Sequence, residues 1–218
     1  MGNVTAIRRI VTRGEADIEN LAVRGGVKYF GCVREFSQSS SSLAGSLLIA
    51  HPSLLDTNFR RAVHIIGAHD AAEGAYGLVL NRPTENTVAD LLPVAEIGAL
   101  ANLPVFIGGP VQQDRLTFAS FRWQGADDIF ECKTQLGVEE AGESLGQKQT
   151  TVRAFIGYSG WTKGQLEAEL EQKAWIVGKP ERGMFEAAKN PSLWREIMRG
   201  LGPWYRLLAD APDDPSLN

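Results

Sequence analysis

Short apolar runs, each ended by glycine, proline or a polar turn, organise most of the chain and predict a strand-rich fold. Gly45–Ala50 is almost continuously apolar, which is typical of a strand buried on both faces. Ala62–Ala68 and Gly77–Leu80 predict two further strands, and the polar turn Asp70–Gly74 between them favours a hairpin. Leu103–Ile107 predicts another strand. Because the strands cluster with few regular alternations of strand and helix, we expect one α+β domain.

Arg153–Val177 is the best-specified stretch of the chain and combines two predicted strands with one predicted helix. Ala154–Ile156 is a short run of strand formers, and Trp175–Val177 predicts a second strand. We expect Gly157–Gly160 to form a turn, because its two glycines can adopt positive φ. The predicted unit is therefore strand, glycine turn, helix, strand.

The helix of this unit has several start signals. Thr162 suits the N-cap position, and Gln165 completes a capping box by reaching back to the backbone N–H of the cap. Trp161 precedes the cap and is expected to pack on Leu166 as a hydrophobic staple. Leu166 and Leu170 then form the buried stripe of the helix.

The polar positions of the same segment are expected to face water. Glu169 and Lys173 are spaced as an i,i+4 ion pair. Ser159 and Glu167 belong to neither the cap nor the buried stripe. We therefore expect substitutions of Ser159 and Glu167 to be nearly neutral for stability.

A glycine turn that leads into a helix start also has two enzymatic interpretations, and both fit poorly. A phosphate-binding P-loop requires G-x-x-x-x-G-K-[ST], but Thr162 stands at the second glycine and Gly164 at the Ser/Thr position. A nucleophile elbow requires G-x-S-x-G, and here Gly157 precedes Ser159 but Trp161 replaces the second glycine. A structural turn is the favoured interpretation, and a small-ligand or partner site is the alternative.

Several other segments predict elements by pattern alone. Thr87 is expected to cap a short helix with Asp90 at its third position and Leu91 directed inward. Strands are predicted near Leu116–Phe121 and Ile129–Lys133, and a weakly structured charged stretch from Glu139 to Gly142. A second helix is expected to start at Asn190-Pro191 and to stop at Gly202-Pro203.

Composition argues against several classes of function. The chain has 218 residues and a net charge of −4, and its 22 basic residues are scattered, with Arg8-Arg9 and Arg60-Arg61 as the densest groups. Proteins that bind DNA directly usually cluster lysine and arginine, so direct sequence-specific DNA binding is not expected. No apolar run approaches the roughly 20 residues that cross a membrane, and no secretion signal is evident. We expect a cytoplasmic protein.

No motif in the sequence predicts a metal or a cofactor. Cys32 and Cys132 are the only cysteines and show neither metal-ligand nor disulfide-framework spacing. His51, His64 and His69 are the only histidines, and the last two are expected on opposite faces of one strand because their separation is odd.

One segment, GYSGWTKGQLEAEL, resembles the G-Y-[AS]-G-W-x-x-G-Q-L-E-x-E signature of the bacterial YqgE/AlgH family. The resemblance implies an irregular, bifurcated or partly barrel-like mixed sheet flanked by helices. The family itself is largely uncharacterised. Its members are commonly labelled transcriptional regulators, and no catalytic residues are established for them. Ala119-Ser120-Phe121 departs from the family, whose members often have Leu-His there. Three further motifs match, namely Gly45–Phe59, Tyr76–Thr84 and Val105–Arg115, and Pro212–Asn218 resembles the terminus of some members.

The resemblance covers residues 43–218, which we interpret as the family domain, and leaves residues 1–42 as a variable N-terminal extension. Within the extension, Glu15–Val23 predicts a helix and Val27–Phe30 a strand. The extension is expected to lie on the domain or on a neighbouring molecule.

We expect the glycine-rich ends of the predicted strands to converge and form a binding site for an unidentified protein or small molecule. A non-enzymatic, indirectly regulatory protein is the leading hypothesis, because no coherent set of acid, base and nucleophile is present. An enzyme or small-molecule sensor built from the same polar residues is the alternative. Arg82 and Arg115 could clamp an anion, although structural bridges to Asp114 or Glu167 are favoured. The candidate residues are Asn81, Arg82, Pro83, Gly108, Gly109, Pro110, Asp114, Arg115, Gly157, Tyr158, Ser159, Gly160, Trp161, Gln165 and Glu167.

Overall fold

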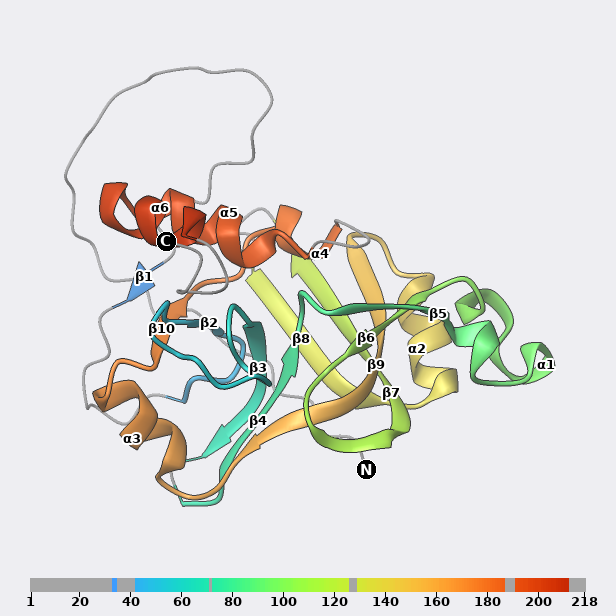
Figure 1. Cartoon of the computed structure of the whole chain (residues 1–218). Coiled ribbons are helices and arrows are strands. Elements are labelled where there is room, and N and C mark those ends of the chain that lie inside the picture. The colour runs from blue at the N-terminus through green and yellow to red at the C-terminus, as the bar shows by residue number, and fades with distance from the viewer. Residues whose placement is uncertain (1–32, 35–41, 71, 126–128, 187–190, 212–218) are drawn as a thin grey trace, which may run out of the picture.

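A computed structural model describes residues 33–34, 42–70, 72–125, 129–186 and 191–211 (Figure 1). The described strands are β1 (Val33–Arg34), β2 (Leu47–Ala50), β3 (Val63–Asp70), β4 (Gly74–Val79), β5 (Pro83–Thr87), β6 (Pro104–Ile107), β7 (Val111–Gln124), β8 (Ile129–Leu136), β9 (Thr150–Trp161) and β10 (Trp175–Gly178). The α-helices are α1 (Val94–Ile97), α2 (Val138–Leu145), α3 (Gln165–Glu171), α4 (Gly183–Glu186), α5 (Leu193–Gly200) and α6 (Pro203–Asp210), and the 3₁₀ helices are η1 (Val88–Asp90) and η2 (Gly98–Leu100).

The described strands form one open mixed sheet that divides at β9. One branch runs in the order β1-β10-β2-β3-β4-β9, and the second contains β5, β6, β7 and β8 around the other half of β9. Figure 1 shows β9 crossing from the side of α2 to the side of α3. Only the β6–β9 pair is parallel among the described strand pairs. The α+β prediction is confirmed, and of the alternatives for the sheet it is the bifurcated one that is observed.

The division requires β9 to change neighbours at Gly157, so the turn predicted at Gly157–Gly160 is wrong. Ile156 pairs with β6 and β7, whereas Ser159 pairs with Gly77 of β4. Gly157 has φ +69, and a Cβ atom there would lie 2.5 Å from the carbonyl oxygen of Gly109. The glycine therefore bends a continuous strand, because β9 pairs with β6 before Gly157 and with β4 after it.

Helix α3 begins later than the capping pattern predicts. Its N-cap is Gly164, with φ +73, so the assignment of Thr162 as N-cap is wrong. Gln165 still accepts a hydrogen bond from the Thr162 backbone N–H at 3.1 Å, which preserves one half of the predicted box. Leu166 and Leu170 are buried, as predicted.

Other predicted elements are partly confirmed. The β3–β4 hairpin forms, and all four residues of β2 are buried. The Asp90 carboxylate accepts the Thr87 backbone N–H at 2.7 Å as predicted, but Leu91 is exposed. Helix α2 occupies the stretch predicted to be weakly structured, and α6 follows the predicted stop at Gly202-Pro203. Helix α5 begins at Leu193 rather than at Asn190-Pro191, and Asn190 itself lies outside the described residues.

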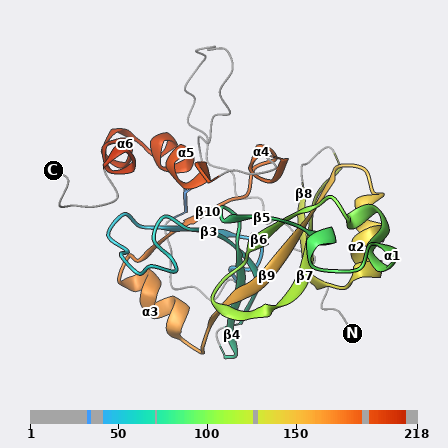
Figure 2. The same cartoon turned by 45° about the vertical axis from the view of Figure 1, so that its right-hand side comes forward.

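Helices cover the sheet from several sides. In Figures 1 and 2, α4, α5 and α6 line one side of the molecule, α3 lies apart from them, and α1 and α2 pack near the branch containing β5–β8. The larger apolar core spans both branches and includes Phe106 and Phe121 as well as Trp161, Trp175 and Trp194, and a smaller core lies beneath α2. Of the N-terminal extension, β1 is described and pairs with β10; the predicted helix 15–23 and strand 27–30 lie outside the described residues.

Candidate functional site

The predicted convergence of the motif loops is confirmed, and Gly108 is its centre. The Gly108 N–H donates to the carbonyl oxygen of Ile156 in β9 at 2.8 Å. The Gly108 carbonyl oxygen accepts the Val79 N–H at 2.9 Å and the Ser159 hydroxyl at 3.2 Å. Segments from β4, β6 and β9 are therefore joined at one residue.

The neighbouring motif residues extend this junction. The Ile107 N–H donates to the carbonyl oxygen of Arg82 at 2.8 Å, which joins β6 to the segment that starts β5 at Pro83. A Cβ atom on Gly109 would lie 2.2 Å from the carbonyl carbon of Tyr158. Gly109 is therefore needed because two backbones approach too closely for any side chain.

Ser159 and His64 form a buried pair inside this junction. Both residues have no exposed surface, and His64 Nε2 lies 3.0 Å from Ser159 Oγ. The Ser159 hydroxyl donates to the Gly108 carbonyl oxygen, so Oγ is left to accept the proton that Nε2 carries. The alternative tautomer would give up one of these two hydrogen bonds. In the favoured arrangement His64 does not accept a proton from Ser159, as a general base for a serine nucleophile must.

His64 is enclosed by aromatic rings and has one polar atom without a partner. Its ring centroid lies 5.0 Å from that of Trp175, 5.5 Å from Trp161 and 5.4 Å from Phe59. Within the described part of the chain, Nδ1 is a buried side-chain atom with no hydrogen-bond partner. Burial, with a smaller contribution from the positive charge of Arg82, lowers the pKa of His64 from 6.5 to about 3.

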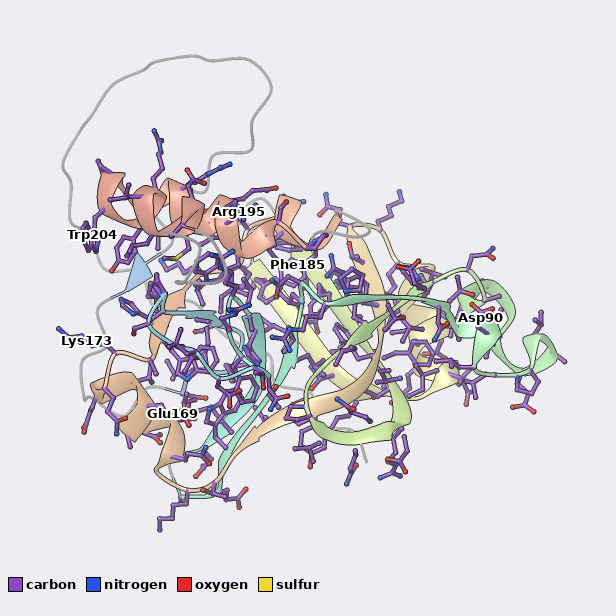
Figure 3. All side chains as sticks on the ribbon, viewed as in Figure 1. Asp90, Glu169, Lys173, Phe185, Arg195 and Trp204 are labelled. Atoms are coloured by element: carbon purple, nitrogen blue, oxygen red, sulfur yellow. The ribbon has the colours of Figure 1, made fainter. Side chains whose placement is uncertain are left out.

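The indole groups of two tryptophans meet at one carboxylate of α3. Glu169 Oε2 accepts the N–H of Trp161 at 2.9 Å and that of Trp175 at 2.7 Å, and Glu169 Oε1 accepts the Gln165 side chain at 2.9 Å. Figure 3 shows Glu169 between α3 and the sheet. The predicted pairing of Glu169 with Lys173 is therefore wrong. The Glu169 carboxylate instead joins β9 to β10, because it accepts the indole N–H groups of Trp161 and Trp175.

Glu167 also has a partner that its sequence position did not suggest. Its Oε1 lies 2.8 Å from His69 Nε2, while His69 Nδ1 accepts the Leu43 backbone N–H at 3.0 Å. Because Nδ1 accepts, Nε2 carries the ring proton and donates it to the carboxylate. The expectation that Glu167 bridges an arginine is wrong, because Glu167 links α3 to β3 through His69. This contact argues against a neutral effect of its substitution on stability.

Asn81 serves the backbone of the preceding loop. Its Oδ1 accepts the Val63 N–H at 2.9 Å, and its Nδ2 donates to the carbonyl oxygen of Arg61 at 2.9 Å. Arg61 has φ +55, an unusual value for a residue other than glycine. The buried amide of Asn81 therefore stabilises the turn that leads into β3.

The charged motif residues lie nearer to water. Arg82 is half-buried, and its Nη2 donates to the carbonyl oxygens of Thr57 and Arg60, both at 3.4 Å. Arg115 is exposed and donates to the Gln112 side chain at 3.4 Å, and Asp114 is also exposed. The favoured structural bridges to Asp114 or Glu167 are not formed among the described residues.

The remaining candidates divide between core and surface. Trp161 is buried and Tyr158 is half-buried with its ring centroid 5.1 Å from that of Tyr76. Pro110 and Gly160 are exposed.

No sequence pattern singles out Arg153, although it is the most deeply buried arginine of this region. Its Nη1 donates to the Leu80 carbonyl oxygen at 3.0 Å, and its Nη2 donates to that of Phe185 at 3.1 Å. Its guanidinium carbon lies 4.6 Å from the ring centroid of Phe106. Burial lowers the pKa of Arg153 to about 10. Alternation along β9 was the only available signal, and it does not single out one side chain.

The described ranges contain no cluster of three or more His, Cys, Asp and Glu side chains that could hold a metal ion. Among the helices described, none is long and apolar enough to cross a membrane.

Comparison with known proteins identifies the family. Residues 47–206 match a profile described as DUF179, AlgH-like. A UPF0301 protein of Streptomyces avermitilis is 39% identical over 189 residues, covering 82% of this chain and 96% of that protein. A UPF0301 protein of Mycobacterium leprae is 34% identical over 183 residues, covering 80% and 90%.

Two solved structures share the fold. The crystal structure of a Corynebacterium diphtheriae protein aligns with a TM-score of 0.61 at 22% identity, covering 81% of this chain and 95% of that one. The solution structure of AlgH from Pseudomonas aeruginosa, also named UPF0301, aligns with a TM-score of 0.57 at 26% identity, covering 82% and 98%. With four motifs in order, a family profile over most of its length and this shared fold, the chain belongs to the AlgH-like (UPF0301) family, the YqgE/AlgH family that its motifs resemble.

Proposed function

We propose that this chain acts by binding a protein or small molecule through its exposed motif residues, defined as Pro110, Asp114 and Arg115. This proposal is supported by a difference in burial: some motif residues are buried in the protein and others are exposed at its surface. Ser159 and Asn81 are buried and hydrogen-bonded within the protein, so they serve as scaffold. Pro110 lies in the loop between β6 and β7, and Asp114 and Arg115 lie in the first part of β7, where its pairing with β9 is irregular between Val111 and Leu116. Loops and irregular segments carried on a rigid scaffold are where binding sites are commonly built.

The proposal includes a cytoplasmic location and an indirect effect on transcription. The net charge of −4 and the pI of about 5.5 disfavour direct DNA binding, so any effect on transcripts runs through a partner or ligand. The exposed motif residues carry both signs of charge, which suits a polar partner surface better than a nucleic-acid backbone.

The experiment compares two double variants in a strain that lacks the gene. Asp114→Asn with Arg115→Gln removes one charge of each sign from the exposed motif residues. Glu143→Gln with Lys148→Gln is the matched control, since both residues are exposed and lie outside the motifs. We expect the motif variant to reproduce the transcript profile of the deletion with an unchanged melting temperature, and the control to restore the wild-type profile. Full restoration by the motif variant, or a deletion with no transcript change, contradicts the proposal.

A second candidate function is a hydrolase that uses Ser159, which the 3.0 Å distance to His64 Nε2 favours. Burial and the direction of the hydrogen bonds argue against it. The test is labelling of the purified full chain with a fluorophosphonate, which reacts with activated serines. We expect no labelling, whereas labelling that Ser159→Ala and His64→Gln both abolish would establish the enzymatic alternative.

A further inference from the structure

Helix α6 carries apolar side chains on two sides. Its inner side holds the buried Ala209 and the half-buried Tyr205, whose ring centroid lies 6.5 Å from that of His51. Its outer side carries Trp204 and Leu207, and each of these side chains is 65% exposed. A helix at the surface of a protein normally turns charged and polar residues toward water. The outer side of α6 is therefore typical of a helix that another element covers.

A positive charge lies at the edge of this apolar surface. Arg206 is exposed, and among the described residues no carboxylate pairs with it. The only carboxylate of α6, that of Asp210, instead pairs with Arg199 of α5 at 2.5 Å. We define the outer face of α6 as Trp204, Arg206 and Leu207. An element that covers this face needs an apolar stripe with negative charge beside it.

The outer face of α6 is too small to hold a second copy of the chain by itself. A fully buried aromatic side chain covers about 150–250 Å², so Trp204 at 65% exposure offers about 100–160 Å². Leu207 is smaller and offers less at the same exposed fraction. A stable interface between two proteins needs about 800 Å² from each partner. A segment of the same chain needs less area, because its tether keeps it at an effective concentration of about a millimolar.

Of the segments outside the described ranges, only the N-terminal extension is long and apolar enough to cover this face. Residues 212–218 contain two aspartates and a single large apolar residue, Leu217. The other gaps within residues 43–218 are at most four residues long. The extension therefore supplies the candidate segment.

Within the extension, residues 15–23 have the character that the outer face of α6 requires. Their spacing predicts a helix with Ile18 and Leu21 on one face. Glu15 and Asp17 fall at the edges of that face, and their negative charge is opposite to the positive charge at the edge of α6. A helix of this length is about 14 Å long, close to the roughly 12 Å of the eight-residue α6. Because so short a helix is marginal in water, it needs a surface to pack on.

The position of β1 puts residues 15–23 within reach of α6. Strand β1 pairs with β10, which pairs with β2, and the indole N–H of Trp194 in α5 donates to the Ala50 carbonyl oxygen of β2 at 2.7 Å. Because neighbouring strands lie about 4.8 Å apart, β1 is about 10 Å from β2. Residues 24–32 can span up to about 30 Å when extended. In Figure 1, β1 lies on the side of the molecule that α5 and α6 line, and Figure 3 shows Trp204 on that side.

We propose that residues 15–23 form an acidic amphipathic helix that packs Ile18 and Leu21 on the outer face of α6. The acidic edge of this helix then faces Arg206. The N-terminal extension thereby covers an apolar surface of its own chain. The inference is independent of the proposed function, because the outer face of α6 contains none of the exposed motif residues.

The experiment detects the contact directly by NMR on the full chain. Nuclear Overhauser cross-peaks are recorded between the indole ring protons of Trp204 and methyl groups, and Trp204→Phe assigns the indole signals. We expect cross-peaks from the methyl groups of Ile18 or Leu21. A second sample mixes isotope-labelled with unlabelled chains and selects contacts between molecules, and there we expect no cross-peak to Trp204.

Two matched variants test the predicted stripe. Leu21→Asp places a charge within the stripe, so the cross-peaks between Ile18 and Trp204 should be lost. Asn20→Asp places the same charge on the opposite side of the predicted helix and should leave those cross-peaks unchanged. The inference is overturned if the extension makes no contact with Trp204 in the wild type, or if the two variants give equal cross-peaks. Contacts seen only between molecules also overturn it and would identify a second copy as the occupant.

Discussion

Acidification should destabilise this protein through His64, and the size of the effect follows from its burial. The pKa of His64 is lowered to about 3 in the folded chain, against 6.5 for an unperturbed histidine. Between these values the unfolded chain binds a proton that the folded chain does not, so stability rises with pH. The stabilisation is present above pH 6.5 and is lost progressively as the pH falls toward 3.

The expected loss is large enough to measure. Between pH 7 and pH 5, protonation of His64 stabilises the unfolded state and not the folded state. About 1.5 pH units of this interval lie below the unfolded pKa of 6.5, and at 1.36 kcal/mol per unit the loss of stability is about 2 kcal/mol. Urea denaturation curves at the two pH values give the free energy of unfolding. Every other titrating group contributes as well, including His51, whose pKa burial also lowers.

A double difference isolates His64 from these groups. His64→Gln removes the titration and keeps a side-chain amide that can donate to Ser159 Oγ. The wild type should lose about 2 kcal/mol more between pH 7 and pH 5 than the variant does, whatever the absolute stability of either protein. Equal losses in the two proteins would falsify the assignment of His64 as a buried neutral histidine.

Three further predictions test the packing around the site. Glu169→Ala should cost about 1–3 kcal/mol, measured by urea denaturation, because two indole N–H groups lose their acceptor; an unchanged tryptophan fluorescence spectrum would argue against these contacts. Gly109→Ala should destabilise by about 1–3 kcal/mol or more through the clash with β9, whereas the control Gly142→Ala, with no atom near its added Cβ, should stabilise α2 by up to about 1 kcal/mol. Thr162→Ala should cost less than the ~1 kcal/mol of an N-cap, and Trp161→Ala about 3–5 kcal/mol; a reversed order contradicts the observed helix start.

Local patterns in the sequence determined the strands and the family. Apolar runs such as Gly45–Ala50 predicted buried strands because continuous burial on both faces leaves no polar position. The spacing in 165–171 predicted the inward-facing leucines of α3, since helical periodicity is a property of neighbouring residues. Four motifs in order also sufficed to indicate the AlgH-like family, and that resemblance implied an irregular, bifurcated or partly barrel-like sheet.

The tertiary structure alone decided how those elements meet. The sequence predicted a turn at Gly157–Gly160, but strands far away in sequence pair with this segment and keep it extended. His64 and Ser159 are 95 residues apart, and Glu167 meets His69 across 98 residues. No local spacing encodes such contacts, because they depend on which strands become neighbours in the sheet. The strands and the helical stripe were therefore readable from the chain itself, whereas the partners of its polar side chains were set by long-range pairing.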